Sequence, residues 1–530
     1  MDPASASLSP FTLNDATGCA YTFPTDGPTL LCFVKEDCDT CNTVLPLLEQ
    51  IHQACGEDLT VLAAGQTAEG NELLRQRHSL KLPLLDDSSL KVSFTYVVDI
   101  VPTIILADGS GSELKRLEGF SKEEWQHLVR DLADLDVGGE VEIDWPAYPD
   151  WRPGCGSMSA DPINAARLQA EVENSPLRAR RIAIAEQDDV HEFMFDQGFS
   201  DGLPLIPPTA ERVMKMLAGT RRDPQEPIAT VPPNMGTATV EKVAINAVMA
   251  GCKPEYLVVI IAALEAACTD EFNIHGVMAT TMGASPLMVI NGPIRQRIGM
   301  NMKMSALGQG NRANASIGRA LRLAIRNIGG AEPGGTERST LGNPMKFTMC
   351  FAEWEERNPW QPLHVERGFE PNDSVVSLFA MTSGPTLIVD QSSRKAAQLA
   401  GSIGLGLESA QHPRAHMATN VVLVVSPEHI DTLMRDNYSK QDLRTRIQEV
   451  TTVPMRALVR DDTSGVGMDP DRIKDLPAEM LDRPMPKFRS EEDIHIVVAG
   501  SEAGKFSAAF HGWAVGPIGS IPVSRKIEEV

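Results

Sequence analysis

The sequence predicts an α/β protein with more than one domain, and three observations support this fold class. At 530 residues, the chain is longer than one ordinary domain. Short apolar runs of strand length alternate with segments whose apolar residues have helical spacing. Hydrophobic residues make up 42% and charged residues 22%, which is typical of a globular protein. We expect a small N-terminal α/β domain and a larger α/β or α+β body, in which a boundary near residue 370 would separate two lobes.

The first quarter of the chain alternates predicted strands and helices in a regular order. Residues 108–111, Asp-Gly-Ser-Gly, have the composition of a hairpin turn, and Ser121 to Glu124 form a capping box at a helix start. The expected elements are a strand at 29–34, a helix at 41–54, a strand at 59–64, a helix at 70–78, strands at 104–107 and 114–117, and a helix from Ser121 to about Leu135.

Two cysteines at the start of the first helix predict thiol–disulfide exchange for this region. Cys38 and Cys41 are separated by two residues. The free N–H groups and the macrodipole of a helix N-terminus stabilise a thiolate there, so Cys38 would attack a disulfide and Cys41, one turn further on, would resolve the product. Glu36, Asp37 and Asp39 oppose this by repelling negative charge. We therefore expect a Cys38 less acidic than in strong oxidants, and a reducing couple.

This order of elements, together with Val101-Pro102-Thr103 before the third strand, resembles the thioredoxin superfamily over about residues 20–136. The resemblance implies that Pro102 is a cis-proline beside a redox-active disulfide between Cys38 and Cys41. It also implies a reductant of the thioredoxin-reductase type as a partner. Asp37 replaces the Trp that usually precedes the first cysteine, and the residue after Cys38 is not the usual Gly or Pro.

The chain divides into a thioredoxin-like domain at 1–136, a Pro- and Trp-rich linker at 137–175 that we expect to lie against one of the domains, and a large α/β body at 176–530 that we expect to be catalytic. The body resembles a large uncharacterised bacterial family without an established activity. The residues that carry this resemblance are 201–209, 240–252 and 500–513. In the body we expect helices at 238–250, 254–267 and 313–327 and strands at 287–290, 386–390, 421–425 and 494–498.

Two further cysteines and one histidine are candidate catalytic residues. Cys155 lies in a Gly/Ser turn of the linker, where it could reach the thioredoxin-like domain, and residues 152–158 resemble the Cys/Sec-Gly-Ser-Cys element of some bacterial selenoproteins with Met158 in place of the second cysteine. Cys252 stands between two helices, and N–H groups of the second helix would lower its pKa. His275 follows a helix end close to acidic residues, a setting for acid–base work. A structural role is the alternative for each.

Three charged residues of the body are candidates for binding substrate. Arg319 belongs to an arginine stripe on a predicted helix and would bind a carboxylate or phosphate, or pair with acidic residues. Glu241 lies in a first helical turn, where it would face a pocket or solvent. Lys505 follows a Gly-rich turn that departs from a phosphate loop, so we expect the turn to line a pocket and not to bind nucleotide.

Charge and composition exclude several partners. A net charge of −23 and an aromatic content of 5% argue against nucleic acid and anionic membranes. We find neither a signal-peptide pattern nor an apolar run of about 18 residues, and nine cysteines in such a chain favour a cytoplasmic setting. We expect no metal, since His412 and His416 lack a third ligand at a known spacing, and no cofactor beyond the disulfide. Apolar, glycine-rich segments are compatible with a homo-oligomer.

We interpret the chain as a thiol-dependent redox enzyme in which the CxxC domain supplies reducing equivalents to small-molecule chemistry in the body. One alternative is a cysteine-dependent lyase or hydrolase whose nucleophile the first domain keeps reduced. Another is a non-catalytic redox-sensing or scaffold protein.

Overall fold

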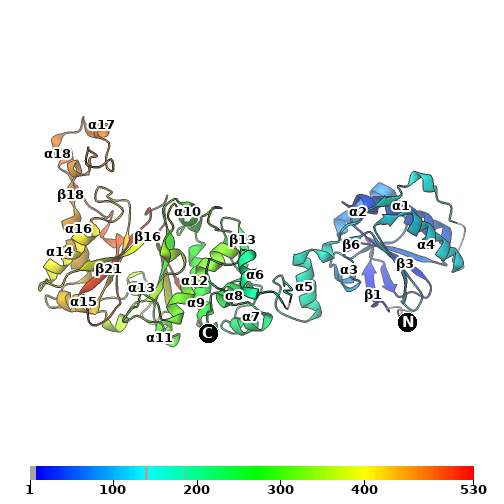
Figure 1. Cartoon of the computed structure of the whole chain (residues 1–530), viewed down its shortest axis with the longest axis horizontal. Helices are drawn as coiled ribbons and strands as arrows, with labels where there is room; N and C mark the ends of the chain where they lie inside the picture. Colours follow the sequence, from blue (N-terminus) through cyan, green and yellow to red (C-terminus); the bar gives the residue numbers. More distant parts are fainter. Residues whose placement is uncertain (1–6, 136, 138–140, 186, 530) are drawn as a thin grey trace. The chain divides into compact units, whose positions relative to one another are not determined.

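The computed structural model describes residues 7–135, 137, 141–185 and 187–529. The chain forms two compact units, Met1–Ala183 and Ile184–Val530, each of which combines helices with a sheet (Figure 1). The predicted fold class, a thioredoxin-like α/β domain followed by a larger α/β body, is confirmed.

The first unit is built on a mixed sheet with strand order β5-β4-β3-β7-β8. Its middle strands consist of apolar residues without alternation, because helices cover both faces of the sheet. β3 is parallel to β4 and antiparallel to β7, and β8 follows β7 through a hairpin. The strands are β3 (Thr29–Val34), β4 (Thr60–Gly65), β5 (Leu84–Asp86), β7 (Thr103–Ala107) and β8 (Glu113–Glu118).

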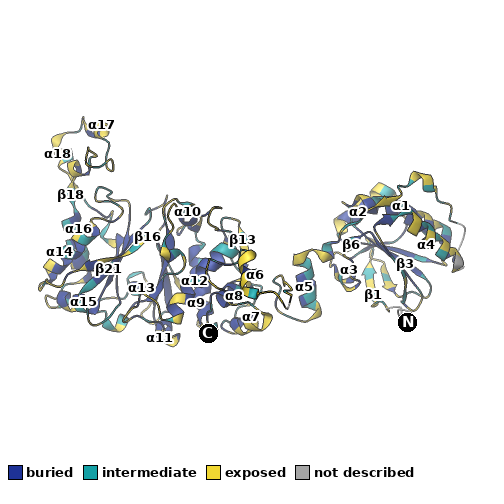
Figure 2. Cartoon of the chain, in the orientation of Figure 1, coloured by how far each residue is buried: buried dark blue, intermediate teal, exposed yellow. Residues whose placement is uncertain are grey.

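The helices of this unit begin where side chains accept the free N–H groups of the first turn. Thr67 caps α2 and Ser121 caps α4, as the capping-box pattern predicts for the latter. The central strands and the inner side of α1 form one buried core (Figure 2). The helices are α1 (Asp39–Cys55), α2 (Ala68–His78), α3 (Lys91–Thr95), α4 (Lys122–Asp134) and α5 (Pro162–Val172), and the short strands β1 (Phe11–Asn14) and β2 (Ala20–Phe23) pair with each other.

The segment that follows α4 returns to this unit and pairs with it. β10 (Trp151–Arg152) is antiparallel to β9 (Phe120–Ser121), and β11 (Cys155–Gly156) is antiparallel to β6 (Ile100–Val101). Trp145 and Tyr148 pack against the core. The described residues of the predicted linker thus belong to the first unit, and we call residues 151–158 the return segment.

The second unit is built on a mixed sheet with strand order β15-β14-β16-β21-β17-β20, in which β22 also pairs with β16. Strands from both sides of residue 370 pair within it, so the two lobes that the sequence allows would share one sheet. The strands are β14 (Ser285–Asn291), β15 (Cys350–Ala352), β16 (Val375–Val389), β17 (Val421–Val425), β20 (Ile494–Val498), β21 (Phe506–Gly512) and β22 (Val523–Lys526).

Two groups of helices pack on this sheet. α8 (Val240–Met249), α9 (Leu257–Ala267) and α12 (Arg312–Asn327) pack on one another, and α9 and α12 contact the strands β16, β22 and β15. At the other end, α14 (Ala396–Leu407), α15 (Pro427–Met434) and α16 (Lys440–Thr451) cover β17, β20 and β21. The shorter helices are α6 (Val190–Asp196), α7 (Ala210–Leu217), α10 (Ile274–Ala279), α11 (Ile294–Arg297) and α13 (Leu363–Glu366).

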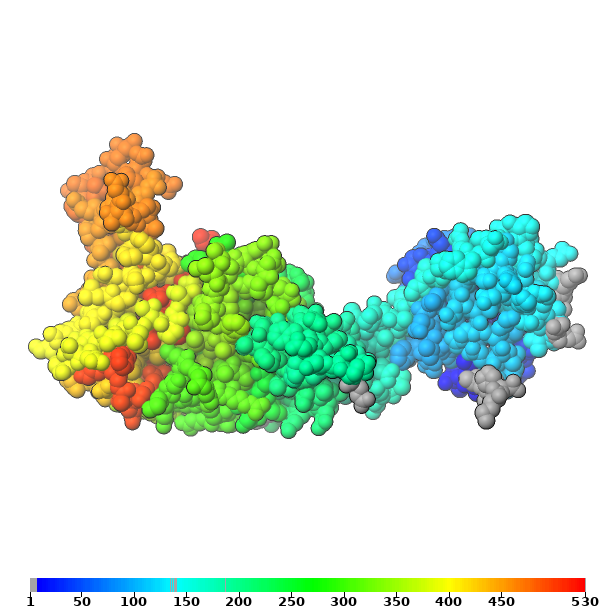
Figure 3. All heavy atoms as spheres, in the orientation of Figure 1, coloured from blue at the N-terminus to red at the C-terminus, as the bar shows by residue number. Residues whose placement is uncertain are grey.

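A projection from the second unit is formed by the part of the chain between α16 and β20, drawn in orange in Figure 3. It contains β18 (Val453–Pro454), β19 (Pro484–Met485), α17 (Pro470–Ile473) and α18 (Ala478–Leu481), and the pair β12 (Pro227–Val231) and β13 (Gly236–Thr239) lies elsewhere in the unit. Within the described residues, no helix combines the length and the apolar character needed to cross a bilayer.

Candidate functional site

The first group of candidate site residues lies at the N-terminus of α1. Cys38 is the N-cap residue, and its sulfur accepts a hydrogen bond from the backbone N–H of Cys41 at 3.4 Å. Cys41 follows one turn into the helix, and the side chains of both cysteines have no exposed surface. The geometry therefore places one sulfur where helix N–H groups converge and the second sulfur directly behind it.

Hydrogen bonding makes Cys38 strongly acidic. The thiol of Cys41 donates to the Cys38 sulfur and is the largest cause of a pKa lowered to about 5, and donation from the thiol of Cys155 and from the N–H groups of Cys41 and Thr40 acts in the same direction against desolvation. Burial, together with the negative charge of Cys38, raises the pKa of Cys41. One cysteine is thus a thiolate at neutral pH while its neighbour keeps its proton, which is the division that nucleophile and resolving thiol require.

The acidic residues around Cys38 have less influence than the sequence suggests. Asp37 and Asp39 are exposed, and Asp37 pairs with Lys35, the ammonium and carboxylate being 3.2 Å apart. Solvent screens such charges, whereas the hydrogen bonds to the Cys38 sulfur are buried. The prediction of a reducing couple was based on repulsion by these acidic residues, and the structure removes that support.

Pro102 lies next to this sulfur, and the Val101–Pro102 peptide bond is cis. The Cys38 sulfur is 3.4 Å from the carbonyl oxygen of Val101. On the other side of Val101, the return segment places Cys155 directly opposite, as its antiparallel β partner. Three thiols therefore meet at one edge of the unit, of which Cys155 alone is partly exposed.

The third thiol is held in its proton-bound form. Hydrogen bonding to Cys38 raises the pKa of Cys155 to about 11, and burial and the negative charge of Cys38 add to this. Cys155 therefore donates its proton toward Cys38 while Cys38 is a thiolate. Sequence reasoning named Cys155 as able to reach the first domain, but it could not place this cysteine opposite Val101.

The fold does not bring the predicted site residues of the second unit together as it does the three thiols of the first unit. Burial raises the pKa of Cys252 to about 12, the opposite of what a nucleophile requires, although the contact of its sulfur with Ser316 acts in the other direction. Arg319 binds both oxygens of Asp201, at 2.9 and 2.7 Å, so its guanidinium acts as a structural clamp. Glu241 is buried and accepts from the amide of Gln225 at 2.8 Å.

The remaining candidates lie at the surface of the second unit. His275 is exposed in the first turn of α10, and Lys505 is half-buried in the loop after β20. That loop does line a cavity of about 240 Å³, with Gly500, Ser501 and Gly504 on its wall. Among the described residues no cluster of three or more metal-ligating side chains is found.

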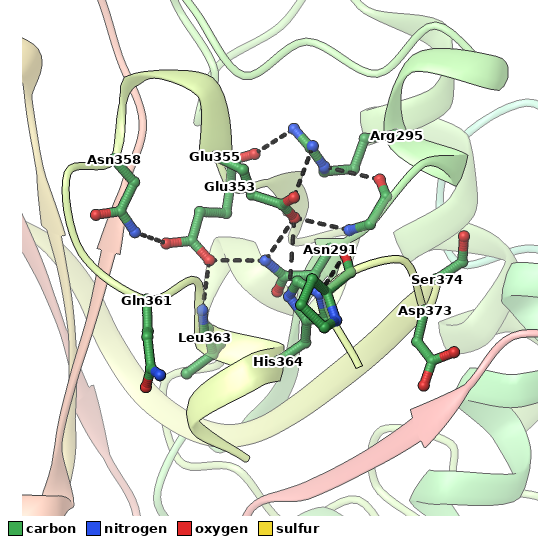
Figure 4. Close-up of polar contacts among 12 residues, drawn as sticks. Asn291, Arg295, Glu353, Glu355, Asn358, Gln361, Leu363, His364, Asp373 and Ser374 are labelled. Atoms are coloured by element: carbon green, nitrogen blue, oxygen red, sulfur yellow. Dashed lines mark hydrogen bonds and ion pairs between the residues drawn. The ribbon is translucent and has the colours of Figure 1, made fainter. Parts of the chain in front are cut away.

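A buried polar cluster in the second unit was missed by sequence reasoning. Glu353 has no exposed surface, and its carboxylate accepts from the amides of Asn291 and Asn358 and from the N–H of Leu363 at 2.7 to 2.8 Å (Figure 4). Desolvation raises the pKa of Glu353. Because these donors come from β14 and from the chain that follows β15, the cluster ties a loop to the sheet.

A second carboxylate of this cluster pairs with a buried arginine. Glu355 binds the guanidinium of Arg295 at 2.8 Å, and His364 is buried with its Nδ1 atom 3.9 Å from the Glu355 carboxylate. In the sequence these acidic residues belong to a Glu-Trp-Glu-Glu run that looks like a solvated surface, so no local pattern reveals their burial.

No protein-family model matches this chain, and no curated protein matches it. Solved structures similar to it include StoA from Bacillus subtilis, with 18% identity over 23% of this chain and 97% of that chain and a TM-score of 0.21. A secreted disulfide oxidoreductase of Mycobacterium tuberculosis, homologous to E. coli DsbE, has 18% identity over 23% of this chain and 96% of that chain, with a TM-score of 0.21. The exposed lipoprotein thioredoxin Etrx1 of Streptococcus pneumoniae has 24% identity over 24% of this chain and 99% of that chain, with a TM-score of 0.21. These similarities concern about a quarter of the chain and bear on its fold alone.

Proposed function

We propose that the first unit is a thiol–disulfide oxidoreductase in which Cys38 is the nucleophile and Cys41 the resolving thiol. The observation that carries the proposal is the Cys38 sulfur at the N-cap of α1, where thiol and N–H donors lower its pKa to about 5. The proton-bound Cys41 lies one turn behind it, within hydrogen-bonding contact.

The reaction follows from these positions. The Cys38 thiolate attacks one sulfur of a disulfide, whose S–S bond breaks, and one thiolate leaves. Cys41 then loses its proton and attacks the Cys38 sulfur, which releases the second thiolate and leaves a Cys38–Cys41 disulfide. When Cys38 attacks the disulfide, its sulfur loses the negative charge that is one of the causes of the raised pKa of Cys41, so the first step itself prepares the second.

We further propose that these reducing equivalents serve small-molecule chemistry in the second unit, in a cytoplasmic setting with a reductant of the thioredoxin-reductase type. Covalent linkage of the two units supports this because it makes each reductive step intramolecular. The cavity beside Gly500 offers space for a small substrate. The raised pKa of Cys252 disfavours the alternative in which that cysteine is the nucleophile of a lyase or hydrolase.

A redox-sensing role is the second candidate, and one observation favours it. The sulfur of Cys38 has no exposed surface because the protein's own return segment pairs beside it. A sensor would use this arrangement to report the redox state without turning over a substrate.

The experiment uses the full chain. Reduced protein is mixed with glutathione disulfide, quenched in acid and analysed as tryptic peptides, with Cys38→Ala as the control. We expect release of two glutathione molecules for each protein molecule and a Cys38–Cys41 bond within peptide 36–75, and none of this in the control. Wild-type protein that leaves both cysteines reduced under these conditions would refute the proposed function.

A further inference from the structure

The return segment is fitted to the edge beside Cys38 by several independent contacts. The hydroxyl of Thr40 donates to the carbonyl of Pro153 at 2.6 Å, and the ammonium of Lys35 donates to the carbonyl of Gly156 at 3.3 Å. Gln66 then holds the end of the segment, donating to the hydroxyl of Ser157 at 2.6 Å and accepting from the N–H of Met158 at 2.9 Å.

Gly154 shows that the fit depends on close approach of two backbones. A Cβ atom at this position would lie 2.0 Å from Cγ2 of Ile100 and 2.9 Å from the carbonyl oxygen of Val101. By contrast, a Cβ atom at Gly156, two residues further on, would meet nothing within 4 Å. Only a glycine at 154 therefore lets the segment pair with β6, and that pairing brings Cys155 to Cys38.

From this geometry we propose that Cys155 is a third redox residue of the first unit, which resolves mixed disulfides at Cys38 and forms a Cys38–Cys155 bond that fastens the return segment over the site. This inference rests on the proposed function of Cys38. The edge that an extended cysteine-bearing chain would occupy by β pairing is occupied here by the protein's own chain, with a cysteine opposite Val101.

The step balances without a further reagent. Cys38 attacks glutathione disulfide, which forms a Cys38–glutathione bond and releases one glutathione thiolate. Cys155 gives up its proton to solvent and attacks the Cys38 sulfur, which forms the Cys38–Cys155 bond and releases the second glutathione. One disulfide is reduced to two thiols, and two protein thiols are oxidised to one disulfide.

The negative charge of Cys38 makes the attack by Cys155 depend on the preceding attack by Cys38. The raised pKa of Cys155 has the hydrogen bond to Cys38 as its largest cause, followed by burial and the negative charge of Cys38. Once Cys38 is in a mixed disulfide, both contributions from Cys38 disappear and Cys155 ionises more readily. In the intact site, Cys41 can then attack the Cys38–Cys155 bond and return Cys155 to its thiol.

The test uses the full chain with Cys41→Ser, treated with glutathione disulfide and digested with trypsin. We expect the release of two glutathione molecules and a link between peptides 36–75 and 131–167, which contain Cys38 and Cys155. The double variant Cys41→Ser/Cys155→Ser should retain one glutathione on Cys38. Stable glutathionylation of Cys38 in the single variant, while wild-type protein still forms Cys38–Cys41, would overturn this inference and leave the proposed function standing.

A matched glycine pair provides the second measurement, which does not require the Cys41 variant to fold. Gly154→Ala should detach the return segment, so that a bulky maleimide modifies Cys38 at least about tenfold faster than in wild type. Gly156→Ala introduces the same methyl group into open space and should leave the rate unchanged. Equal rates in the two variants would show that the segment does not cover Cys38.

Discussion

The contribution of Cys155 to the acidity of Cys38 can be isolated by one substitution. Cys155→Ala removes a thiol that donates to the Cys38 sulfur. A hydrogen bond to a charged group contributes about 1.5–3 kcal/mol, and since a thiol is a weak donor and Cys155 is partly exposed, we take about 1.4 kcal/mol. This corresponds to about one pKa unit, so the pKa of Cys38 should rise by about one unit from its wild-type value.

The assay follows the ultraviolet absorbance of the thiolate during a pH titration of the reduced protein. Subtraction of the Cys38→Ala titration isolates the signal of Cys38, and the method does not require a reagent to reach the buried sulfur. Cys155→Ser is the matched control, because its hydroxyl still donates a hydrogen bond, and its effect should be smaller. A Cys38 pKa that is identical in wild type and Cys155→Ala would refute the reasoning that places this thiol against the Cys38 sulfur.

Two further predictions concern protons and ion pairs. Below the Cys38 pKa of about 5, where reduction takes up two protons, the midpoint potential of the Cys38–Cys41 couple should fall by about 59 mV per pH unit. Above this pKa, where reduction takes up one proton, it should fall by about 30 mV per pH unit. A potentiometric titration with a single slope through pH 5 would contradict this prediction. Arg319→Met should lower the free energy of unfolding of the second unit by about 3 kcal/mol, because it leaves the Asp201 carboxylate without its guanidinium partner. In the same denaturant titration, Arg338→Met, at an exposed position, should change stability by less than about 0.5 kcal/mol, and equal effects of the two substitutions would show that the Asp201 pair is not a clamp.

Elements with a strong local pattern were predictable from the sequence. The strand at 29–34 and the strands at 421–425 and 494–498 have the predicted bounds, and α12 begins one residue before its prediction. The apolar runs of the three strands and the helical spacing of the apolar residues in α12 define both the type of element and its ends.

β16 shows where local pattern fails. It extends over Val375–Val389, whereas the sequence predicts a strand only at 386–390. Gly384 and Pro385 interrupt the apolar pattern within it, and the register with β21 shifts on either side of Ser383. A glycine–proline pair normally marks a turn, so only the neighbouring strands reveal that the chain continues as one strand.

The candidate site was predictable from the sequence only where its residues form a local pattern. Cys38 and Cys41 can be recognised by their spacing and by the helical pattern of the residues that follow them. The position of Cys155 depends on a two-residue strand, β11, which pairs with a strand more than 50 residues earlier. Pairing over such a distance is determined by the fit of Gly154 against Ile100 and Val101, which no local periodicity encodes.

The central claim, that Cys38 and Cys41 form a reversible two-electron couple, is tested most directly by equilibrating the full chain in buffers with graded ratios of glutathione to glutathione disulfide and measuring the Cys38–Cys41 bond in peptide 36–75 after an acid quench. We predict a single reversible transition that follows a two-electron Nernst curve and reaches the same midpoint from the oxidised and the reduced side. Failure of the bond to form at any ratio, or formation that the reduced buffers do not reverse, would contradict the account.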